Sequence, residues 1–428
     1  MKTFKIIFYS IISALLGSCS IDNRPAVSPA AKDPIEEPSS DVESPRGPAA
    51  FRKDLAEEGL TQELAQTIEA SNRIGLDLLT YFSTETEDNV LISPMSFTFA
   101  MGLLAEGTAG NTREDICRFF DSRITDFESF CLNLKVHIER LENNAIIRFA
   151  DLVAVNENYT IKDAYKNAIV SWYDGQIQSF DFHQAKTLQD INSWVADKTD
   201  GWIGDILESM NPSATAYMLN TLFFDAVWRD TFNPDFSHEG KFYPEKREPF
   251  QVTMMSQERQ YPYAEQDGLI CIELPYENGD YLMDILIPSE APLSTVLQDL
   301  SLARIHSLIS SQATRTIRLS LPRFTISCRH HYNDYLINNG LASIYDNPDL
   351  SGMLESGTGE IADIFQKTML SVGEEGTRAA AATVIDLDPT DEPSEAKVVI
   401  LNRPFLFLIR EQATNAIFFA GIYRSPSV

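Results

Sequence analysis

The sequence predicts a mixed α/β protein of the α+β type with substantial antiparallel sheet, and three observations indicate this fold class. Of its 428 residues, 44% are hydrophobic and 22% are charged, which is enough apolar content to bury a large core. The first half carries apolar residues at helical spacing, whereas β-branched and aromatic segments bounded by turn residues dominate after about residue 217. Residues 60–428 contain no repeat of fixed period and no linker-like stretch, so one large domain is expected.

The predicted elements follow in chain order. Amphipathic helices are predicted at 64–82 and 94–106. The next stretch, 107–112, looks like a phosphate-binding loop, but it lacks a lysine and follows a helix, so a helix-ending turn is favoured. Strands are predicted at 219–228, 270–275, 281–287, 316–321, 398–409 and 416–423.

The N-terminus predicts export. Two lysines precede an apolar run at 6–16 that is too short to span a bilayer, as in a signal peptide over residues 1–19. The run ends in the letters LGSC, which resemble the lipobox of bacterial lipoproteins. This resemblance implies that Cys19 is lipidated and that the exported protein is anchored in the bacterial cell envelope, in the periplasm or at the cell surface; a plain secretory signal is the alternative. Residues 20–50 contain six prolines and no aromatic residue, so a disordered Pro/Ser/Glu-rich tether is predicted over 20–55.

The composition excludes several classes of function. The 62 acidic residues outnumber the 34 basic ones, giving a formal net charge of −28. Binding to nucleic acid is therefore not expected, because phosphate contacts need clustered Lys and Arg. Contact with a membrane is expected only through the lipid at Cys19. Four further cysteines, none in C-x-x-C spacing, argue against a zinc or redox site; their spacing is compatible with a 117–131 disulfide and equally with free thiols. They are Cys117, Cys131, Cys271 and Cys328.

No constellation of catalytic residues is found. The sequence lacks the hydrolase elbow G-x-S-x-G, the zinc motif H-E-x-x-H, a Walker loop and the dinucleotide motif G-x-G-x-x-G. Its six histidines are scattered, and the adjacent pair His330 and His331 points to opposite faces of a strand or diverges on a helix. We therefore predict no enzymatic activity, no bound metal and no cofactor.

The stretch 374–388 has the pattern of a half-buried strand that leads into an exposed loop. Split by parity, the charged residues of this stretch from Arg378 onward, which are Arg378, Asp386 and Asp388, all fall on one face. The following residues, 389–395, are polar and contain two prolines, as in a protease-accessible loop. A short alanine helix at 378–383 is the alternative for this stretch taken alone. The uncharged face carries Thr377, Ala379, Ala381, Thr383, Ile385 and Leu387.

Short stretches along nearly the whole folded region match one known family in order and spacing. They include 89–96 (NVLISPMS), 107–112 (GTAGNT), 191–195 (INSWV), 219–224 (LNTLFF) with Trp228, 274–276 (LPY), 321–324 (LPRF), 350–353 (LSGM), 374–377 (EEGT) and 402–407 (NRPFLF). Together they make the chain from about residue 64 to 426 resemble the serpins.

The serpin resemblance implies three β-sheets, eight or nine helices and an exposed reactive-centre loop. It implies a protease inhibitor that acts as a suicide substrate. The target serine or cysteine protease cleaves the loop and forms an acyl-enzyme. The loop then inserts as a new strand into the central sheet and thereby traps the protease. The parity of 377–387 fits insertion, since the inserting face is small near the hinge and free of charge. A monomer is expected, and the alternative function is a non-inhibitory serpin acting as a binding or carrier protein.

The resemblance also assigns roles to individual residues. Ser93, Ser96 and Asn192 correspond to the shutter, the polar cluster beneath the strands that must part, and Trp194 to the breach, where insertion begins. Gln366 stands where the family has a histidine, so pH-dependent opening through that position is not expected. The hinge comprises Glu374, Glu375, Gly376, Thr377, Arg378, Ala379, Ala380, Ala381 and Ala382.

The position of the reactive bond follows from counting along the loop. Counting forward from the hinge places the attacked residue at Thr390, whereas counting back from Asn402 gives Pro393. The bond between Thr390 and Asp391 is favoured. Thr390 suits an elastase-like pocket, and cleavage after Asp391 would instead suit an acid-specific serine or cysteine protease.

Overall fold

Two hydrogen-bonded sheets with helices packed on them form the body of the computed structural model, which describes residues 61–141, 145–277, 279–361, 363–377 and 396–426. The predicted signal peptide and tether, with Cys19, lie outside these residues. The predicted α+β class is confirmed. The helices in the described part are α2 (Gln62–Glu85), α3 (Pro94–Gly107), α4 (Gly110–Phe119), α5 (Ile124–Leu141), α6 (Asp163–Tyr173), α7 (Ala185–Lys198), α8 (Leu293–Gln298), α9 (Leu302–Ser310) and α10 (Asn333–Asn338), with short 3-10 helices η1 (Pro234–Phe236) and η2 (Ala342–Ile344).

Side-chain caps explain where the two predicted helices begin. The hydroxyl oxygen of Thr61 accepts a 3.3 Å hydrogen bond from the backbone N–H of the first turn of α2. The hydroxyl oxygen of Ser93 does the same at α3, where Pro94 occupies the first helical position and needs no N–H partner. The turn predicted at 107–112 is shorter, since only residues 108 and 109 lie between α3 and α4; Gly110, the first residue of α4, has a φ of +52°, which favours glycine.

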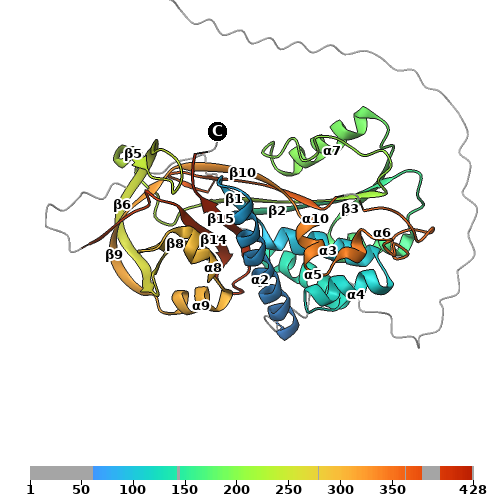
Figure 1. Ribbon diagram of the computed structural model, residues 1–428, viewed down its shortest axis with the longest axis horizontal. Helices are drawn as coiled ribbons and strands as arrows, with labels where there is room; N and C mark the ends of the chain where they lie inside the picture. The colour runs from blue at the N-terminus through green and yellow to red at the C-terminus, as the bar shows by residue number, and fades with distance from the viewer. Residues whose placement is uncertain (1–60, 142–144, 278, 362, 378–395, 427–428) are drawn as a thin grey trace, which may run out of the picture. The chain divides into compact units, whose positions relative to one another are not determined.

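A six-stranded sheet runs across the centre of the body (Figure 1). Its strand order is β10-β11-β12-β4-β2-β3, and β12 is only two residues long. The strands are β2 (Ala145–Asn156), β3 (Gln176–Phe180), β4 (Ala216–Val227), β10 (Phe324–His331), β11 (Phe365–Val372) and β12 (Gly376–Thr377).

Helices cover both faces of this sheet. Figure 1 places α7 on one side and α3 and α5 on the other. Alternate residues of a strand point to opposite faces. Leu152 of β2 accordingly packs in a small cluster with Ile191 and Val195 of α7, whereas its neighbour Val153 belongs to the large core beneath α3. Most of β4 and the second half of β2 are thus buried on both faces, whereas β11 is partly exposed on one face.

The second sheet has nine strands. Eight follow the order β1-β15-β14-β8-β7-β6-β9-β13, and β5 pairs with β6 beside this path. The serpin resemblance implies three sheets; here the long strand β6 joins two of them, because its end at residue 263 pairs with both β7 and β9. The strands are β1 (Val90–Ile92), β5 (His238–Phe242), β6 (Phe250–Gln266), β7 (Leu269–Pro275), β8 (Tyr281–Pro288), β9 (Ala313–Pro322), β13 (Lys397–Ile400), β14 (Phe405–Glu411) and β15 (Ile417–Tyr423).

The structure corrects two expectations about the strands. The half of the chain predicted to be helical also contains β1, β2 and β3. The last seven residues of β2 are all buried, so the alternation that reveals a strand is missing there. The single strand predicted at 398–409 is two strands, β13 and β14, in different parts of the sheet, and Pro404 lies in the break between them.

Two further points concern disulfide bonds and membrane-spanning helices. Cys117, Cys131, Cys271 and Cys328 are all free thiols, so the 117–131 disulfide does not form. Among the described helices, none combines the length and the apolar character needed to cross a membrane.

Candidate functional site

The beginning of the predicted hinge is already a strand in the six-stranded sheet. Gly376 and Thr377 form β12, which pairs with β11 on one side and with β4 on the other. The side chain of Thr377 is fully buried, and its hydroxyl lies 2.6 Å from that of Tyr276. The hinge therefore enters the sheet between β11 and β4. The other predicted hinge residues, Arg378 and Ala379 to Ala382, lie outside the described residues, as does the predicted reactive bond at Thr390 and Asp391.

Only glycine fits at position 376. A Cβ atom built there would lie 2.1 Å from the carbonyl oxygen of Ala226 and 2.8 Å from the Cα of Val227. Both are backbone atoms of β4, so no side-chain rearrangement can make room. Close pairing of β12 with β4 thus depends on Gly376.

Trp228 and Tyr276 support the turn that leads into β12. Their rings stack with centroids 4.4 Å apart and planes inclined by 15°. The indole Nε1–H of Trp228 donates to the carbonyl of Gly373 at 2.9 Å, and its backbone N–H donates to the carbonyl of Glu375 at 2.8 Å. Both rings are buried, so they hold the turn against the body.

Glu374, which is 9% exposed, forms an ion pair at the same turn with Arg323, which is 51% exposed. The guanidinium of Arg323, at the bend between β9 and β10, donates to both of its carboxylate oxygens, with Nε at 3.0 Å from Oε2. The hydroxyl of Ser237 donates to Oε1 at 2.8 Å. Burial alone would raise the pKa of Glu374, but these hydrogen bonds outweigh it and hold the pKa below its usual value. The ion pair fastens the hinge to the end of the sheet.

A second polar cluster lies beneath the sheet and contains three of the predicted shutter residues. The backbone N–H of Ser93 donates to Oε1 of Gln366 at 2.8 Å, and Nε2 of Gln366 donates to the carbonyl of Ser93 at 3.0 Å. The Tyr332 hydroxyl also donates to Oε1 of Gln366, at 3.1 Å. Ser96 donates to the side chain of Asn220 on β4. These bonds join the start of α3 to β11 and β4, the strands on either side of β12.

A charged pair extends this cluster. Asn220 donates to Asp151, its direct partner in the β2–β4 register, and Lys135 of α5 donates to Asp151 at 2.7 Å. Burial raises the pKa of Asp151, and the ammonium of Lys135 opposes this shift. The amine of Lys135 also lies over the ring of Phe99, 5.1 Å from its centroid. A chain of polar contacts therefore runs from α3 through β4 and β2 to α5.

Two predicted site residues lie elsewhere. Asn192 is on α7, where its side chain exchanges hydrogen bonds with the backbone of Leu207, and Trp194 donates to Gln176 at 2.9 Å. Neither contacts the polar cluster or the hinge. Asn220, not Asn192, takes part in the polar cluster, and Trp228, not Trp194, contacts the hinge; both stand in or beside the 219–224 stretch. Asn220 could have been recognised as the one amide in β4, whose first nine residues are all buried.

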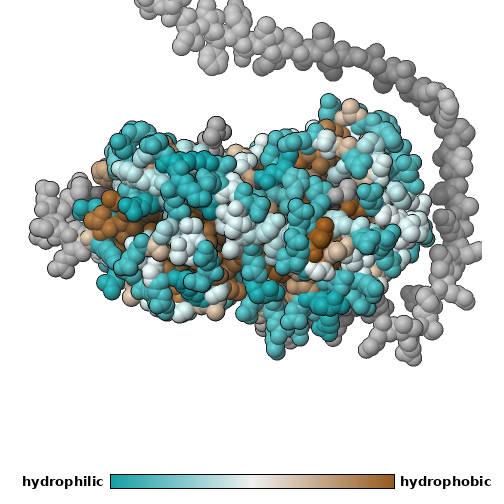
Figure 2. All heavy atoms as spheres, viewed as in Figure 1, coloured by the Kyte–Doolittle hydropathy of each residue, from teal (hydrophilic) through white to brown (hydrophobic). Residues whose placement is uncertain are grey.

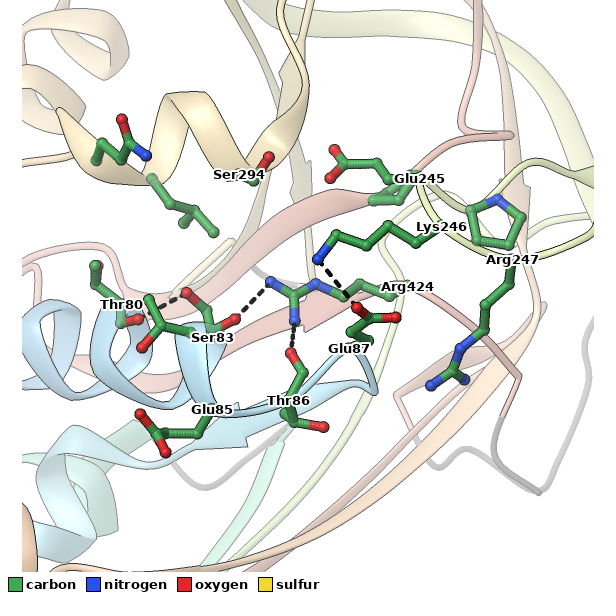
Figure 3. Close-up of a pocket in the computed structure, with 15 residues that line it drawn as sticks. Thr80, Ser83, Glu85, Thr86, Glu87, Glu245, Lys246, Arg247, Ser294 and Arg424 are labelled. Carbon is green, nitrogen blue, oxygen red and sulfur yellow. Dashed lines mark hydrogen bonds and ion pairs between the residues drawn. The ribbon is translucent and has the colours of Figure 1, made fainter.

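A separate pocket of 410 Å³ lies away from the hinge, between the end of α2, α8 and the C-terminal strands (Figure 3). The Arg424 guanidinium projects into it and donates to the carbonyls of Ser83 and Thr86. Lys246 pairs with Glu87 at 3.0 Å on the same wall. The lining mixes charged groups with the apolar side chain of Leu297. No group of three or more potential metal ligands is found in the described part of the chain.

His330 is a buried neutral histidine beside the shutter cluster, directly opposite Gln366 in the β10–β11 register. Its ring stacks on Phe82 at 4.2 Å, and its Nε2 has no hydrogen-bond partner among the described residues. Burial, with a smaller contribution from His331, lowers the pKa of His330 to about 4. The predicted divergence of the histidine pair is confirmed, since His331 is exposed and bonds Asp363.

This burial predicts a dependence of stability on pH. Between pH 6.5 and about 4 the unfolded chain binds a proton at His330 that the folded protein does not, so stability falls as the pH falls. From pH 7.5 to 5, we expect His330 to cost about 2 kcal/mol in the free energy of unfolding. In urea titrations, the free energy of unfolding of His330→Phe should fall by about 2 kcal/mol less than that of wild type between pH 7.5 and 5. The control His306→Gln, at an exposed position on α9, should lose as much stability as wild type. Equal acid sensitivity in all three proteins would contradict the assignment.

A known family, several known proteins and several solved structures are similar to this chain. Residues 69–426 match the family model described as serpin (serine protease inhibitor). An uncharacterized serpin-like protein from Thermococcus kodakarensis is 27% identical, with 98% of each chain covered. Iripin-2 from Ixodes ricinus is 30% identical over 84% of this chain and 94% of its own. The crystal structure of the thermophilic serpin tengpin in its native state superposes with a TM-score of 0.78 at 27% identity, covering 86% of this chain and 96% of that one.

The fold thus defines a protein whose central sheet holds Gly376 and Thr377 of the hinge as the strand β12. The match to the family model spans most of the sequence, and the chain belongs to the serpin family. Members of this family are typically protease inhibitors.

Proposed function

We propose that this protein inhibits a serine or cysteine protease as a suicide substrate. The observation that carries the proposal is β12, because the sheet already accepts the first hinge residues as a strand between β11 and β4. Thr377, the first residue of the uncharged face, points into the core beside Tyr276. The residues that continue this face, from Ala379 to Leu387, are free of charge and can follow Thr377 into the sheet.

The proposed reaction stops at a covalent intermediate. The nucleophilic oxygen or sulfur of the protease attacks the carbonyl carbon of Thr390, and the bond from that carbon to the nitrogen of Asp391 breaks. The new amino group of Asp391 leaves with a proton supplied by the protease. Cleavage frees residues 378–390 to insert as a strand, and the protease, still joined to Thr390, is carried along. Its active site then distorts, and hydrolysis of the ester or thioester stalls.

Insertion can be tested with charges placed on alternate residues. Ala379→Arg and Ala381→Asp put a charge on the inserting face, where burial without a partner is costly. We expect both variants to be cleaved but to form no protease complex that survives boiling in detergent. The matched variants Ala380→Arg and Ala382→Asp place the same charges on the outward face and should still trap. If the inward variants trap as well as the outward ones, insertion does not drive the inhibition.

A second candidate function is that of a non-inhibitory carrier. The pocket in Figure 3 favours it, since 410 Å³ is enough for a small ligand and lies apart from the hinge. The two functions differ in the effect of cleaving the loop. An inhibitor gains strand pairing on insertion, so its melting temperature should rise after limited proteolysis between residues 378 and 395, whereas a carrier that does not insert its loop should melt unchanged.

We further propose that the protein is exported and held in the cell envelope by lipid on Cys19. The support is the signal-like sequence with its lipobox-like end, followed by a stretch rich in proline that can act as a tether. Metabolic labelling with a radioactive or clickable fatty acid should mark the wild-type protein and leave Cys19→Ala unmarked.

A further inference from the structure

The strand that follows the proposed reactive loop carries exposed apolar side chains. Val398 and Ile400 of β13 are 55% and 51% exposed. Of the seven large hydrophobic residues exposed in the described part of the chain, only these two share an element. Figure 2 shows hydrophobic surface at the end of the body where Figure 1 places β6 and β9, the strands next to β13 in the sheet order.

This position is unusual for apolar side chains. β13 ends the described strand order, with β9 as its parallel neighbour on one side. Edge strands of stable proteins commonly carry charged residues that prevent unwanted association. Here the neighbouring charges are already paired, because Arg318, the partner of Val398 on β9, bonds Glu258 at 2.9 Å. Ile400 is level with Ser320, whose hydroxyl lies 2.9 Å from that of Ser256. The exposed face of β13 is therefore apolar and locally neutral.

We infer that Val398 and Ile400 form a docking surface for the target protease, in addition to the reactive bond. We call these two residues the β13 surface. The inference rests on the proposed inhibitory function and names a second contact of the same partner. Three quantities support it: the length of chain between the reactive bond and β13, the size of a protease, and the net charge of this molecule.

The chain length keeps the β13 surface close to the bound protease. Seven residues separate Asp391 from Val398, so the two positions are at most about 25 Å apart even if the chain is fully extended. A protease domain of about 200 residues has a radius of gyration of about 16 Å and extends about 20 Å to each side of its centre. A protease seated on the Thr390–Asp391 bond is consequently large enough and close enough to contact β13. A neutral apolar strip at that place suits an apolar surface patch on the protease.

The net charge argues against a second copy of this chain as the occupant. Two copies of a protein with a formal charge of −28 repel each other strongly, and the neutral β13 surface offers no charge complementarity to offset this repulsion. A protease of opposite or low charge meets no such barrier.

The test compares rates of trapping. The variant Val398→Thr/Ile400→Thr keeps β-branched residues on the strand and removes apolar surface. The control Val170→Thr/Ile337→Thr changes two exposed hydrophobic residues of α6 and α10, which belong to other parts of the molecule. Each protein is incubated with a panel of elastase-like, chymotrypsin-like and acid-specific serine proteases, and the enzyme that wild type traps fastest is used. We expect the β13 variant to trap this enzyme about tenfold more slowly, equivalent to about 1.4 kcal/mol, with unchanged stoichiometry and melting temperature.

A second measurement separates docking from chemistry. The same protease with its nucleophilic serine replaced by alanine should bind the β13 variant about tenfold more weakly than wild type or the control. Equal rates and equal affinities for all three proteins would overturn the β13 surface and leave the inhibitory function standing. Failure of wild type to trap any protease would remove the inhibitory function and this inference together. A wild-type dimer that the β13 variant converts to monomer would assign the surface to a second copy and likewise overturn it.

Discussion

Under the proposed inhibitory function, Gly376→Val is expected to make the protein an ordinary substrate of its protease instead of a trap. The valine side chain would have to overlap the carbonyl oxygen of Ala226, which lies 2.1 Å from the Cβ position, and the Cα of Val227. β12 would then leave the sheet, and its hydrogen bonds to β4 would be lost. Insertion of the loop starts from the hinge, so it would begin later than in wild type. The acyl-enzyme would then be hydrolysed before insertion is complete. We expect at least a tenfold higher ratio of cleaved inhibitor to covalent complex, equivalent to about 1.4 kcal/mol in the competing barriers.

Gly373 provides a matched control in the same turn. A Cβ atom at position 373 meets nothing within 4 Å, and its φ lies outside the left-handed region. Gly373→Val should therefore trap like wild type, and Gly376→Ala should fall between wild type and Gly376→Val. The products are separated on denaturing gels at several ratios of inhibitor to protease. Full trapping by Gly376→Val would show that insertion does not need β12.

Glu374→Lys should open the hinge without any protease. A lysine there would face the like charge of the half-exposed Arg323 and would lose the hydrogen bond from Ser237. The repulsion between the two like charges is screened at the half-exposed Arg323, and it costs on the order of 1 kcal/mol. We expect a lower melting temperature and a growing fraction of protein that is uncleaved but inactive, because a released hinge allows the loop to enter the sheet intact.

A charge exchange tests whether the pair itself is responsible. The double variant Arg323→Glu/Glu374→Lys restores opposite charges and should recover part of the lost melting temperature and active fraction. Arg323→Glu alone should resemble Glu374→Lys. If the double variant is no better than the two single variants, the effect arises from something other than the Arg323–Glu374 contact.

The fold class and the hinge could be predicted because their signals are local. Helical spacing of apolar residues identified α2 and α3, and the parity of the 377–387 stretch placed Thr377 on the inward face, where the structure has it. β2 was missed because burial on both faces removes the alternation that marks a strand.

The pairing of distant residues could not be derived in the same way. Asn192 and Asn220 each stand in a family-like stretch, and so do Trp194 and Trp228, and only the folded chain distinguishes them. Asn220 accepts a hydrogen bond from Ser96, 124 positions away, whereas the side chain of Asn192 donates to the backbone carbonyl of Leu207. Likewise, nothing local in the sequence marks Arg323 as the partner of Glu374.

The stacked pair of Trp228 and Tyr276 has a practical consequence. The indole donates to Gly373, so any movement of the hinge changes both the ring contact and the hydrogen bond of a natural fluorophore. The chain has only four tryptophans, and replacing Trp172, Trp194 and Trp202 with phenylalanine would leave this single emitter. Stopped-flow recording of its emission would then follow the departure and return of the hinge in real time, in unlabelled protein.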